Sequence, residues 1–298
     1  MSDPASLKQA LSLLRTANFR PKRRLGQNFI FDHNILDRIA DIAGLSFQDY
    51  VLEIGAGAGT LTHTLAKRAA LVTAFEVDRK LEPILQQMLR PVTNVRLHWE
   101  DFIKAPLIED LKEDGWPLEK EQAAGIVVSN LPYCITSPAI EKLLAMKSIF
   151  RRLVLLVQAE VAERITAEPN TPSYGSLSVF VQYHCQAKIV AKVSPGAFWP
   201  RPDVDSSLIL LQPVHPGTTA VTDETLFFVV VRAAFGKRRK MLLNALANVR
   251  GPWNSDIIRR ASEQAGISLD RRGETLSVAE FGRLSNAISE SLALEAED

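Results

Sequence analysis

The segment Ser129-Asn130-Leu131-Pro132-Tyr133 combines residue types that suit chemistry on an amino group of an aromatic base. Such an amine is a poor nucleophile, because its lone pair is delocalised into the ring. The Asn130 side-chain carbonyl and the Leu131 backbone carbonyl, held extended by Pro132, can accept both N–H groups and free that lone pair. Tyr133 offers an aromatic face to a base that has left its stack. The segment therefore predicts group transfer to an exocyclic amine without a strong general base, and the alternative interpretation is a simple turn.

A glycine-rich segment further upstream, Gly55-Ala56-Gly57-Ala58-Gly59, predicts a cofactor-binding loop. Glycines allow close approach of a ligand and present backbone N–H groups where a helix begins. Glu76 follows the next predicted strand, near the offset of about 20 residues at which a carboxylate binds ribose hydroxyls. Thr60 occupies the position of the third glycine in the dinucleotide fingerprint. The pattern therefore favours S-adenosylmethionine over a dinucleotide, and a tight turn without a ligand is the alternative.

A third loop, with Asp101 and Phe102, follows the third predicted strand and places a carboxylate and a ring at the same edge of the sheet. There the carboxylate can accept from an adenine amino group, although an Asp after a strand is more often a helix cap. Cys134 has no neighbouring base that would activate it, so we expect a buried structural thiol. With two cysteines and five scattered histidines in the chain, the sequence predicts no protein-held metal and a reduced cytoplasmic protein.

These loops require strands and helices that alternate along the chain. Apolar runs predict strands at 50–54, 71–77, 95–99, 125–129 and 153–158, and helices lie between them or before them at 7–19, 35–42, 60–68, 81–89 and 138–146. Continuous Val/Ile/Leu runs of this kind indicate a parallel, doubly wound sheet. The prediction is an α/β, Rossmann-like methyltransferase domain.

A smaller domain is predicted to follow it. After a helix at 174–183 and two late strands at 189–193 and 207–211, residues 213–219 have the composition of a linker. Beyond them only helical segments are predicted, at 224–249, 255–265 and 278–292. We therefore expect a methyltransferase domain at 1–213, with a basic N-terminal segment at 1–28, and an all-helical RNA-binding domain at 220–298.

Composition excludes several classes of protein. The chain has 298 residues, 46% of them hydrophobic and 23% charged, which is typical of a soluble globular protein. No signal peptide or membrane span is predicted. A net charge of +1 argues by itself against a polyanion partner. The bases nevertheless gather in two clusters beside aromatic residues, and the predicted phosphate-binding residues are Lys22, Arg23, Arg24, Lys237, Arg238, Arg239 and Lys240.

Together these motifs resemble the KsgA-type family of small-subunit ribosomal RNA adenine dimethyltransferases, over nearly the whole chain. The resemblance also includes Tyr174-Gly175-Ser176-Leu177 and the basic clusters, and it is carried further by the segments 23–29, 53–57, 76–78, 101–102, 130–133, 198–206 and 235–240. It implies transfer of methyl groups from S-adenosylmethionine to N6 of two adjacent adenosines in the 3′-terminal hairpin of 16S ribosomal RNA, on a maturing 30S subunit. The product is N6,N6-dimethyladenosine.

The resemblance also implies roles for individual residues. The implied cofactor residues are Gln27, Asn28, Ile30, Gly55, Gly57, Glu76, Val77, Asp101, Phe102 and Asn130. The implied catalytic residues are Asn130, Leu131, Pro132, Tyr133 and Phe198, with Phe198 and Tyr133 enclosing the target base. An apolar plug is the alternative role for Phe198. One departure from the family is Cys134, where many relatives carry a second aromatic residue.

Other functions stay open at this point. An Erm-type methylase would perform the same chemistry on a large-subunit adenosine, and the longer helical tail argues against it. A ribosome-assembly factor with secondary catalysis is an alternative from another class. A DNA methyltransferase would need a target-recognition insertion, and Thr60 disfavours a nicotinamide oxidoreductase. The expected partner is small-subunit RNA, with no membrane and no DNA, and nothing requires more than a monomer.

Overall fold

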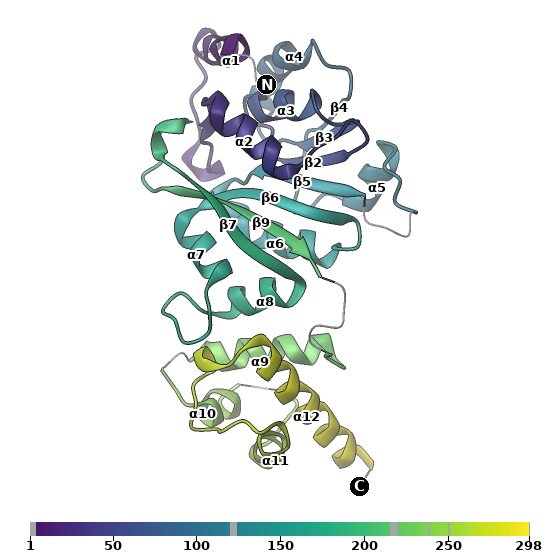
Figure 1. The fold of residues 1–298 in the computed structure, drawn as a ribbon, viewed down its shortest axis with the longest axis vertical. Helices are drawn as coiled ribbons and strands as arrows, with labels where there is room; N and C mark the ends of the chain where they lie inside the picture. Colours follow the sequence, from purple (N-terminus) through teal and green to yellow (C-terminus); the bar gives the residue numbers. More distant parts are fainter. Residues whose placement is uncertain (1–3, 120–123, 215–219, 238, 250, 298) are drawn as a thin grey trace. The chain divides into compact units, whose positions relative to one another are not determined.

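The protein divides into two compact units. The structure is a computed structural model that describes residues 4–119, 124–214, 220–237, 239–249 and 251–297. Unit 1 comprises Met1–Ala162 and Lys188–Pro213, and unit 2 comprises Glu163–Ala187 and Val214–Asp298. Figure 1 shows the α/β architecture of unit 1 and the helices of unit 2.

A seven-stranded sheet, in the order β4-β3-β2-β5-β6-β9-β7, forms the centre of the first unit. The strands are β2 (Tyr50–Ile54), β3 (Leu71–Phe75), β4 (Val95–His98), β5 (Gly125–Asn130), β6 (Phe150–Gln158), β7 (Cys185–Val193, which begins in unit 2) and β9 (Ser206–Pro213). Strands β2 to β6 pair in parallel, as predicted.

The parallel pairing predicted for the first five strands does not extend to β9, whose direction the sequence leaves open. Strand β9 pairs antiparallel with β6, with Gln158 opposite Ser206. A parallel strand needs a crossover connection, usually an α-helix. The connection from β7 to β9 contains only a 3₁₀ turn and the two-residue strand β8, so β9 follows β7 without such a crossover.

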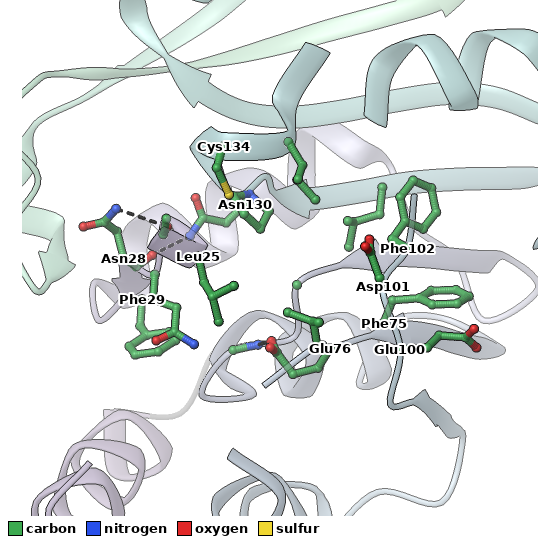
Figure 2. Close-up of a pocket in the computed structure, with 18 residues that line it drawn as sticks. Leu25, Asn28, Phe29, Phe75, Glu76, Glu100, Asp101, Phe102, Asn130 and Cys134 are labelled. Atoms are coloured by element: carbon green, nitrogen blue, oxygen red, sulfur yellow. Dashed lines mark hydrogen bonds between the residues drawn. The ribbon is translucent and has the colours of Figure 1, made fainter. Parts of the chain in front are cut away.

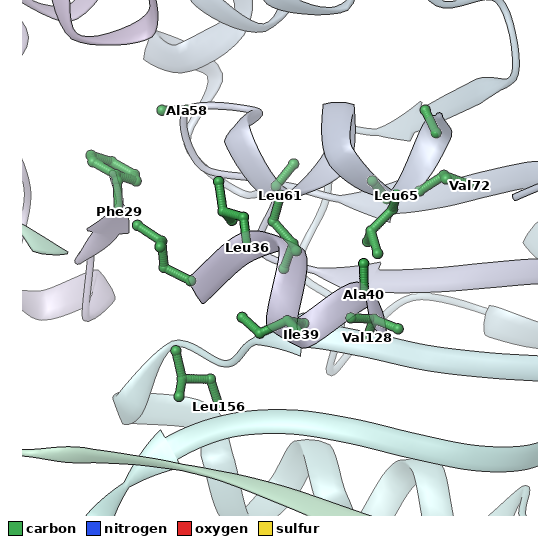
Figure 3. Packing of buried hydrophobic residues seen from close by; sticks show 14 of the residues in the cluster. Phe29, Leu36, Ile39, Ala40, Ala58, Leu61, Leu65, Val72, Val128 and Leu156 are labelled. Atoms are coloured by element: carbon green, nitrogen blue, oxygen red, sulfur yellow. The ribbon is translucent and has the colours of Figure 1, made fainter. Parts of the chain in front are cut away.

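Helices contribute buried apolar side chains to the core of the first unit. They are α1 (Pro4–Thr16), α2 (His33–Ala43), α3 (Thr60–Ala66), α4 (Glu82–Leu89), α5 (Leu107–Glu113) and α6 (Thr136–Ala145). The Asp32 carboxylate accepts from Asn34 N and caps α2, which ends at Gly44, as predicted. Figure 3 shows Leu36 and Ile39 of α2 among the buried side chains of this core. Each such buried Leu or Ile contributes about 1.5–3 kcal/mol.

A second, two-stranded sheet was not predicted. Strand β1 (Phe29–Ile30) pairs antiparallel with β8 (Phe198–Trp199), so Phe29 lies opposite Trp199 and Ile30 opposite Phe198. Runs of two residues carry no detectable periodicity, and the two partners lie far apart in the sequence. This short ladder holds the N-terminal segment beside the residues that precede β9.

The second unit is helical. Its elements are α8 (Ser176–His184), α9 (Glu224–Gly236), α10 (Leu242–Ala247), α11 (Ser255–Ala265) and α12 (Val278–Glu297), and α7 (Ala159–Thr166) begins in unit 1. The helical segment predicted at 224–249 contains two helices, because α9 ends at Gly236 and α10 begins at Leu242. No helix of the described residues is long and apolar enough to cross a membrane.

The division into units also differs from the predicted boundary. The prediction assigned residues 163–187 to the first domain, whereas they belong to unit 2. Tyr174 explains this assignment: it is 1% exposed, packs in the same core cluster as Phe227 and Phe281, and donates its hydroxyl to Leu276 O at 2.8 Å. Helix α8 completes a core that the C-terminal helices share.

Candidate active site

The loops after β2, β3, β4 and β5 meet the N-terminal segment around one pocket. Its volume, including the part open to solvent, is about 780 Å³, which is within the usual range for a small-molecule site. Figure 2 shows the side chains that surround it. The lining residues are Leu25, Gly26, Gln27, Asn28, Phe29, Ile54, Gly55, Gly57, Phe75, Glu76, Val77, Glu100, Asp101, Phe102, Asn130, Pro132, Cys134 and Ile135.

Every predicted cofactor residue except Ile30 lies in this lining. Ile30 is 2% exposed, and its carbonyl accepts from Thr60 Oγ1 at 3.0 Å. The carboxyl ends of parallel strands share one edge of a sheet, which explains how short motifs separated by strand–helix pairs come together here.

Two backbone N–H groups of the glycine loop have partners other than the ligand that the sequence predicts. Gly55 N donates to Phe75 O at 2.8 Å, and Gly57 N donates to Glu76 Oε2 at 2.8 Å. Both N–H groups are therefore used inside the protein and are not directed at a ligand. Gly55 has φ +81°, and a Cβ there would stand 3.0 Å from Pro132 Cγ. Glycine at this position lets the cofactor loop contact the catalytic loop.

Glu76 lies at the end of β3, with 6% of its surface exposed. One oxygen accepts from Gly57 N and the other from Asp78 N, both at 2.8 Å. Burial raises the pKa of this carboxyl, and the two backbone donors oppose the shift. Each carboxylate oxygen has a second lone pair, so the group can still accept from ribose hydroxyls. Beside it Val77 is 51% exposed and offers apolar surface to a ligand.

Rings and a carboxylate line the far end of the pocket. Phe102 is 3% exposed and meets Phe75 edge to face, with ring centroids 5.5 Å apart. The ammonium of Lys142 lies 5.0 Å from the Phe102 centroid. Asp101 Oδ1 accepts from Ile103 N at 3.0 Å, so this residue caps a turn, whereas the alternative interpretation was a helix cap. Flat apolar walls with one acceptor at the rim suit an adenine ring.

Lys22 ties the basic N-terminal segment to Asp78, in the loop after β3. Its ammonium pairs with Asp78 Oδ1 at 2.8 Å, and Gln27 Nε2 donates to the other oxygen at 3.0 Å. Lys22 also donates its backbone N–H to Gln27 Oε1 at 2.7 Å. Burial alone would raise the pKa of the Asp78 carboxyl. The hydrogen bonds from Lys22 and Gln27 outweigh this effect, so the pKa is lowered. The structure thus places the predicted phosphate-binding Lys22 in an internal ion pair, whereas Arg23 and Arg24 are exposed.

In the catalytic loop, Asn130 Nδ2 donates to Asn28 O at 2.7 Å, as the dashed line in Figure 2 marks. This bond turns the amide so that Oδ1 lies on the side away from Asn28 O. Leu131 is 1% exposed and donates its N–H to Leu156 O at 3.1 Å. The Tyr133 hydroxyl and Ser206 Oγ are 2.7 Å apart, and burial raises the pKa of the tyrosine. The loop is therefore held from both sides.

A wide groove adjoins the pocket. It includes about 1480 Å³ with its open part, and its lining comprises Pro21, Arg23, Gly26, Gln27, Asn28, Tyr133, Cys134, Gln158, Trp199, Pro200, Arg201, Pro202, Asp203 and Val204. Gly26, Gln27, Asn28 and Cys134 line both hollows. The pocket and the groove therefore meet at the catalytic loop.

Comparison with known proteins decides the family. The model of the family described as "Ribosomal RNA adenine dimethylase" matches residues 18–289. The chain belongs to this family. It is 43% identical over 290 residues to the "Ribosomal RNA small subunit methyltransferase A" of Bacillus mycoides, covering 97% of this chain and 98% of the relative. The protein of the same name from Geobacillus thermodenitrificans is 44% identical over 288 residues, with coverages of 96% and 97%.

Solved structures agree on the fold of this family member. A dimethyladenosine transferase from Plasmodium falciparum superposes with a TM-score of 0.72 at 25% identity, covering 87% of this chain and 97% of that one. The 23S rRNA methyltransferase ErmE gives a TM-score of 0.64 at 24% identity, with coverages of 88% and 100%. The Rossmann-like methyltransferase fold with a helical C-terminal part is thereby confirmed.

Two predicted residues of the dimethylase differ from expectation. Cys134 is exposed, not buried, because it follows Tyr133 on the turn between the pocket and the groove. Phe198 is 6% exposed within the core cluster and lines neither hollow, so its contact with the base stays a prediction. In the second unit Lys237, Arg239 and Lys240 are exposed, and Arg238 lies outside the described residues.

Sequence reasoning missed several lining residues, notably Leu25, Phe75, Glu100 and Ile135. Each is a direct neighbour of a predicted residue or motif, so extending every motif by one residue at its ends would have found most of them. Trp199 belongs to the segment 198–206 that carries the resemblance, but the sequence assigns it no role, because its place in the groove depends on the β1–β8 ladder.

Proposed function

We propose that this protein methylates two adjacent adenosines in the 3′-terminal hairpin of small-subunit ribosomal RNA, to N6,N6-dimethyladenosine, as the 30S subunit matures. The observation that carries the proposal is the position of Asn130: its amide is anchored on Asn28 where the cofactor pocket meets the groove. A methyl donor in the pocket and a base in the groove would meet at this amide. Family membership supports the RNA substrate.

S-adenosylmethionine fits the residues present. The pocket combines an acceptor with free lone pairs at Glu76, apolar surface at Val77 and ring walls at Phe75 and Phe102. We assign the ribose to Glu76, the adenine to Asp101 and Phe102, and the methionine part to Gln27, Asn28 and the Gly55 loop. When bound, S-adenosylmethionine would supply a methyl group that its positively charged sulfur activates.

The catalytic loop prepares the nucleophile. Asn130 Oδ1 and the Leu131 carbonyl accept the two N6–H groups of adenine, which favours the pyramidal amine and frees its lone pair. Bound S-adenosylmethionine would supply the methyl group to this nitrogen, and its sulfur would keep the electron pair of the carbon–sulfur bond. The alkylated nitrogen releases one proton, and no strong general base is needed because this nitrogen is acidic. In a second turnover, another molecule of S-adenosylmethionine would supply the methyl group that replaces the remaining N–H.

Tyr133 supplies the face on which the extruded adenine stacks. Its hydroxyl is fixed by Ser206, so the ring is oriented before RNA arrives. We keep Phe198 as the proposed second wall, which requires its buried side chain to turn toward the groove on binding. We propose that exposed basic side chains contact the RNA phosphates. They are Arg23, Arg24, Lys237, Arg239 and Lys240, together with Arg238. The predicted cytoplasmic location and monomeric state stay predictions.

The Erm-type alternative is less well supported. Relatives that cover nearly the whole chain carry small-subunit names, whereas the large-subunit enzyme ErmE has the lower TM-score of the two solved structures above. The two activities differ in substrate and not in chemistry, so the choice of ribosomal particle distinguishes them.

The test is transfer of labelled methyl groups from S-adenosylmethionine to undermethylated 30S particles, 50S particles and naked RNA. We expect transfer to 30S particles, and preference for 50S particles would favour the Erm-type alternative. Asn130→Ala should reduce transfer by about 100-fold or more, the usual effect of removing one positioned polar group from an active site. The exposed Asn34→Ala serves as the matched control. Undiminished transfer by Asn130→Ala would refute the assignment of this residue.

A further inference from the structure

The groove beside the catalytic loop contains an aromatic side chain that the proposed chemistry does not use. Trp199 lies in β8, half-buried, and lines the groove together with Tyr133. The proposed mechanism places only the target base, which stacks on Tyr133. The groove is far larger than one base requires, at about 1480 Å³ including its open part.

The β1–β8 ladder orients Trp199. Residues opposite each other in a ladder project to the same face, so Phe29 and Trp199 share one face while Ile30 and Phe198 share the other. Ile30 and Phe198 are buried in the core, 2% and 6% exposed. The Trp199 ring stacks on Phe29, with ring centroids 6.3 Å apart and planes inclined by 26°. One side of the indole is thus supported from behind while its other surface borders the groove.

Groups that suit a nucleotide surround this indole. Arg201 and Arg23, both exposed, line the same groove, and Asp203 is the one carboxylate among its described lining residues. Gln158, the last residue of β6, adds an amide with both donor and acceptor atoms. Unpaired RNA bases are recognised by stacking on aromatic side chains and by hydrogen bonds at their edges, and guanidinium groups hold the phosphates.

We propose that Trp199 is a second stacking platform, which binds the nucleotide adjacent to the adenosine undergoing methylation. Gln158 contacts the edge of this base, and Arg23 and Arg201 contact the flanking phosphates. The inference rests on the proposed function and deepens it, because a substrate with two adjacent adenosines always presents a second base beside the one that is methylated. Trp199 is a positioning residue and does not touch the methyl group.

The first test measures indole fluorescence without cofactor, so its outcome does not depend on methyl transfer. The probe is a synthetic RNA hairpin whose loop contains two adjacent adenosines, compared with hairpins that carry an abasic nucleotide beside the target adenosine. We expect the intact hairpin to quench wild-type fluorescence and the quench to disappear in Trp199→Phe, which still binds the RNA. An equal quench in wild type and Trp199→Phe would overturn the proposal.

The second test measures steady-state methyl transfer to undermethylated 30S particles. Trp199→Leu should raise the KM for RNA about tenfold or more, because stacking on an aromatic residue contributes strongly to binding of each base. Trp199→Phe should stay within about threefold of wild type, and so should Trp99→Leu, a half-buried tryptophan of the same unit that lines neither hollow. The kcat and the cofactor Kd should not change in any of these variants.

The abasic substrate closes a double-mutant cycle. Removing the neighbouring base should weaken wild-type binding about as much as Trp199→Leu does, and the two changes combined should cost little more than either alone. Additive losses would refute contact between this base and Trp199. Failure of wild type to methylate any ribosomal particle would instead refute the proposed function, and the quench and the binding cycle would still test the platform.

Discussion

Replacing Glu53 with glutamine should remove a pH dependence of stability that this carboxyl imposes on unit 1. Glu53 lies in β2 beneath the glycine loop and is 1% exposed. Its Oε2 has no hydrogen-bond partner in the described part of the chain. Burial raises the pKa of Glu53 to about 8, and the charge of Glu76 adds to the shift. The folded protein therefore holds a proton on this group at neutral pH.

The size of the effect follows from proton linkage. The ordinary pKa of the group is 4.5, so the folded state binds more protons than the unfolded state between pH 4.5 and about 8. The stability contributed by the protonated form is fully present below pH 4.5 and is lost as the pH rises through 8. The slope is about 1.4 kcal/mol per pH unit, which amounts to about 2.5 kcal/mol between pH 5.5 and 7.5. Glu53→Gln has no such proton to lose.

The assay is denaturant unfolding, followed by tryptophan fluorescence at pH values from 5.5 to 7.5. Trp253, the tryptophan of unit 2, is replaced by Phe in all proteins, so that Trp99, Trp116 and Trp199 report unit 1 alone. The free energy of unfolding of wild type, relative to Glu53→Gln, should fall by about 2.5 kcal/mol over this range.

Glu109→Gln is the matched control, because Glu109 is an exposed glutamate of α5 in the same unit. Its stability should follow the wild-type pH profile throughout. If the Glu53→Gln profile also ran parallel to wild type, then burial would not hold a proton on Glu53, and the reasoning from its burial would be refuted.

Two further predictions concern the site itself. Glu76→Ala should weaken cofactor binding by about 1.5–3 kcal/mol, the usual contribution of a hydrogen bond to a charged group, and unchanged affinity by calorimetry would mean that the ribose contact is misplaced. Ser206→Ala should raise the KM for RNA severalfold without changing cofactor affinity, because Tyr133 loses the hydroxyl that orients its ring. Tyr133→Phe should mimic this effect, and independent losses in the double variant would contradict a shared role.

The parts of the fold that the sequence predicts are those with local causes. Strands β2, β3 and β5 are mostly apolar runs, and Asp32 and Gly44 mark the ends of α2 by their capping chemistry. The residues that line the pocket could be predicted because each motif directly follows a strand, and the carboxyl ends of parallel strands share an edge. Local pattern and global topology agree at these positions.

What the sequence could not predict depends on pairing between distant segments. The direction of β9 is set by its partner β6, and its own pattern suits either direction. The contact of Lys22 with Asp78 joins a basic cluster to the loop after β3, so a residue predicted to bind phosphate has an internal partner. The exposure of Cys134 follows from the tight turn after Tyr133, which composition does not reveal.

The β1–β8 ladder shows why such pairing matters for the chemistry. Two residues on each strand form too few hydrogen bonds to persist alone, so the ladder depends on Ile30 and Phe198, whose burial in the core anchors its inner face. Its outer face couples the two halves of the site, since Phe29 lines the cofactor pocket and stacks on Trp199 of the groove. A shift of either strand would therefore move the methyl-donor side and the RNA side together. Core packing thus contributes to the spacing between the pocket and the groove, together with the hydrogen bonds that anchor the Asn130–Tyr133 loop.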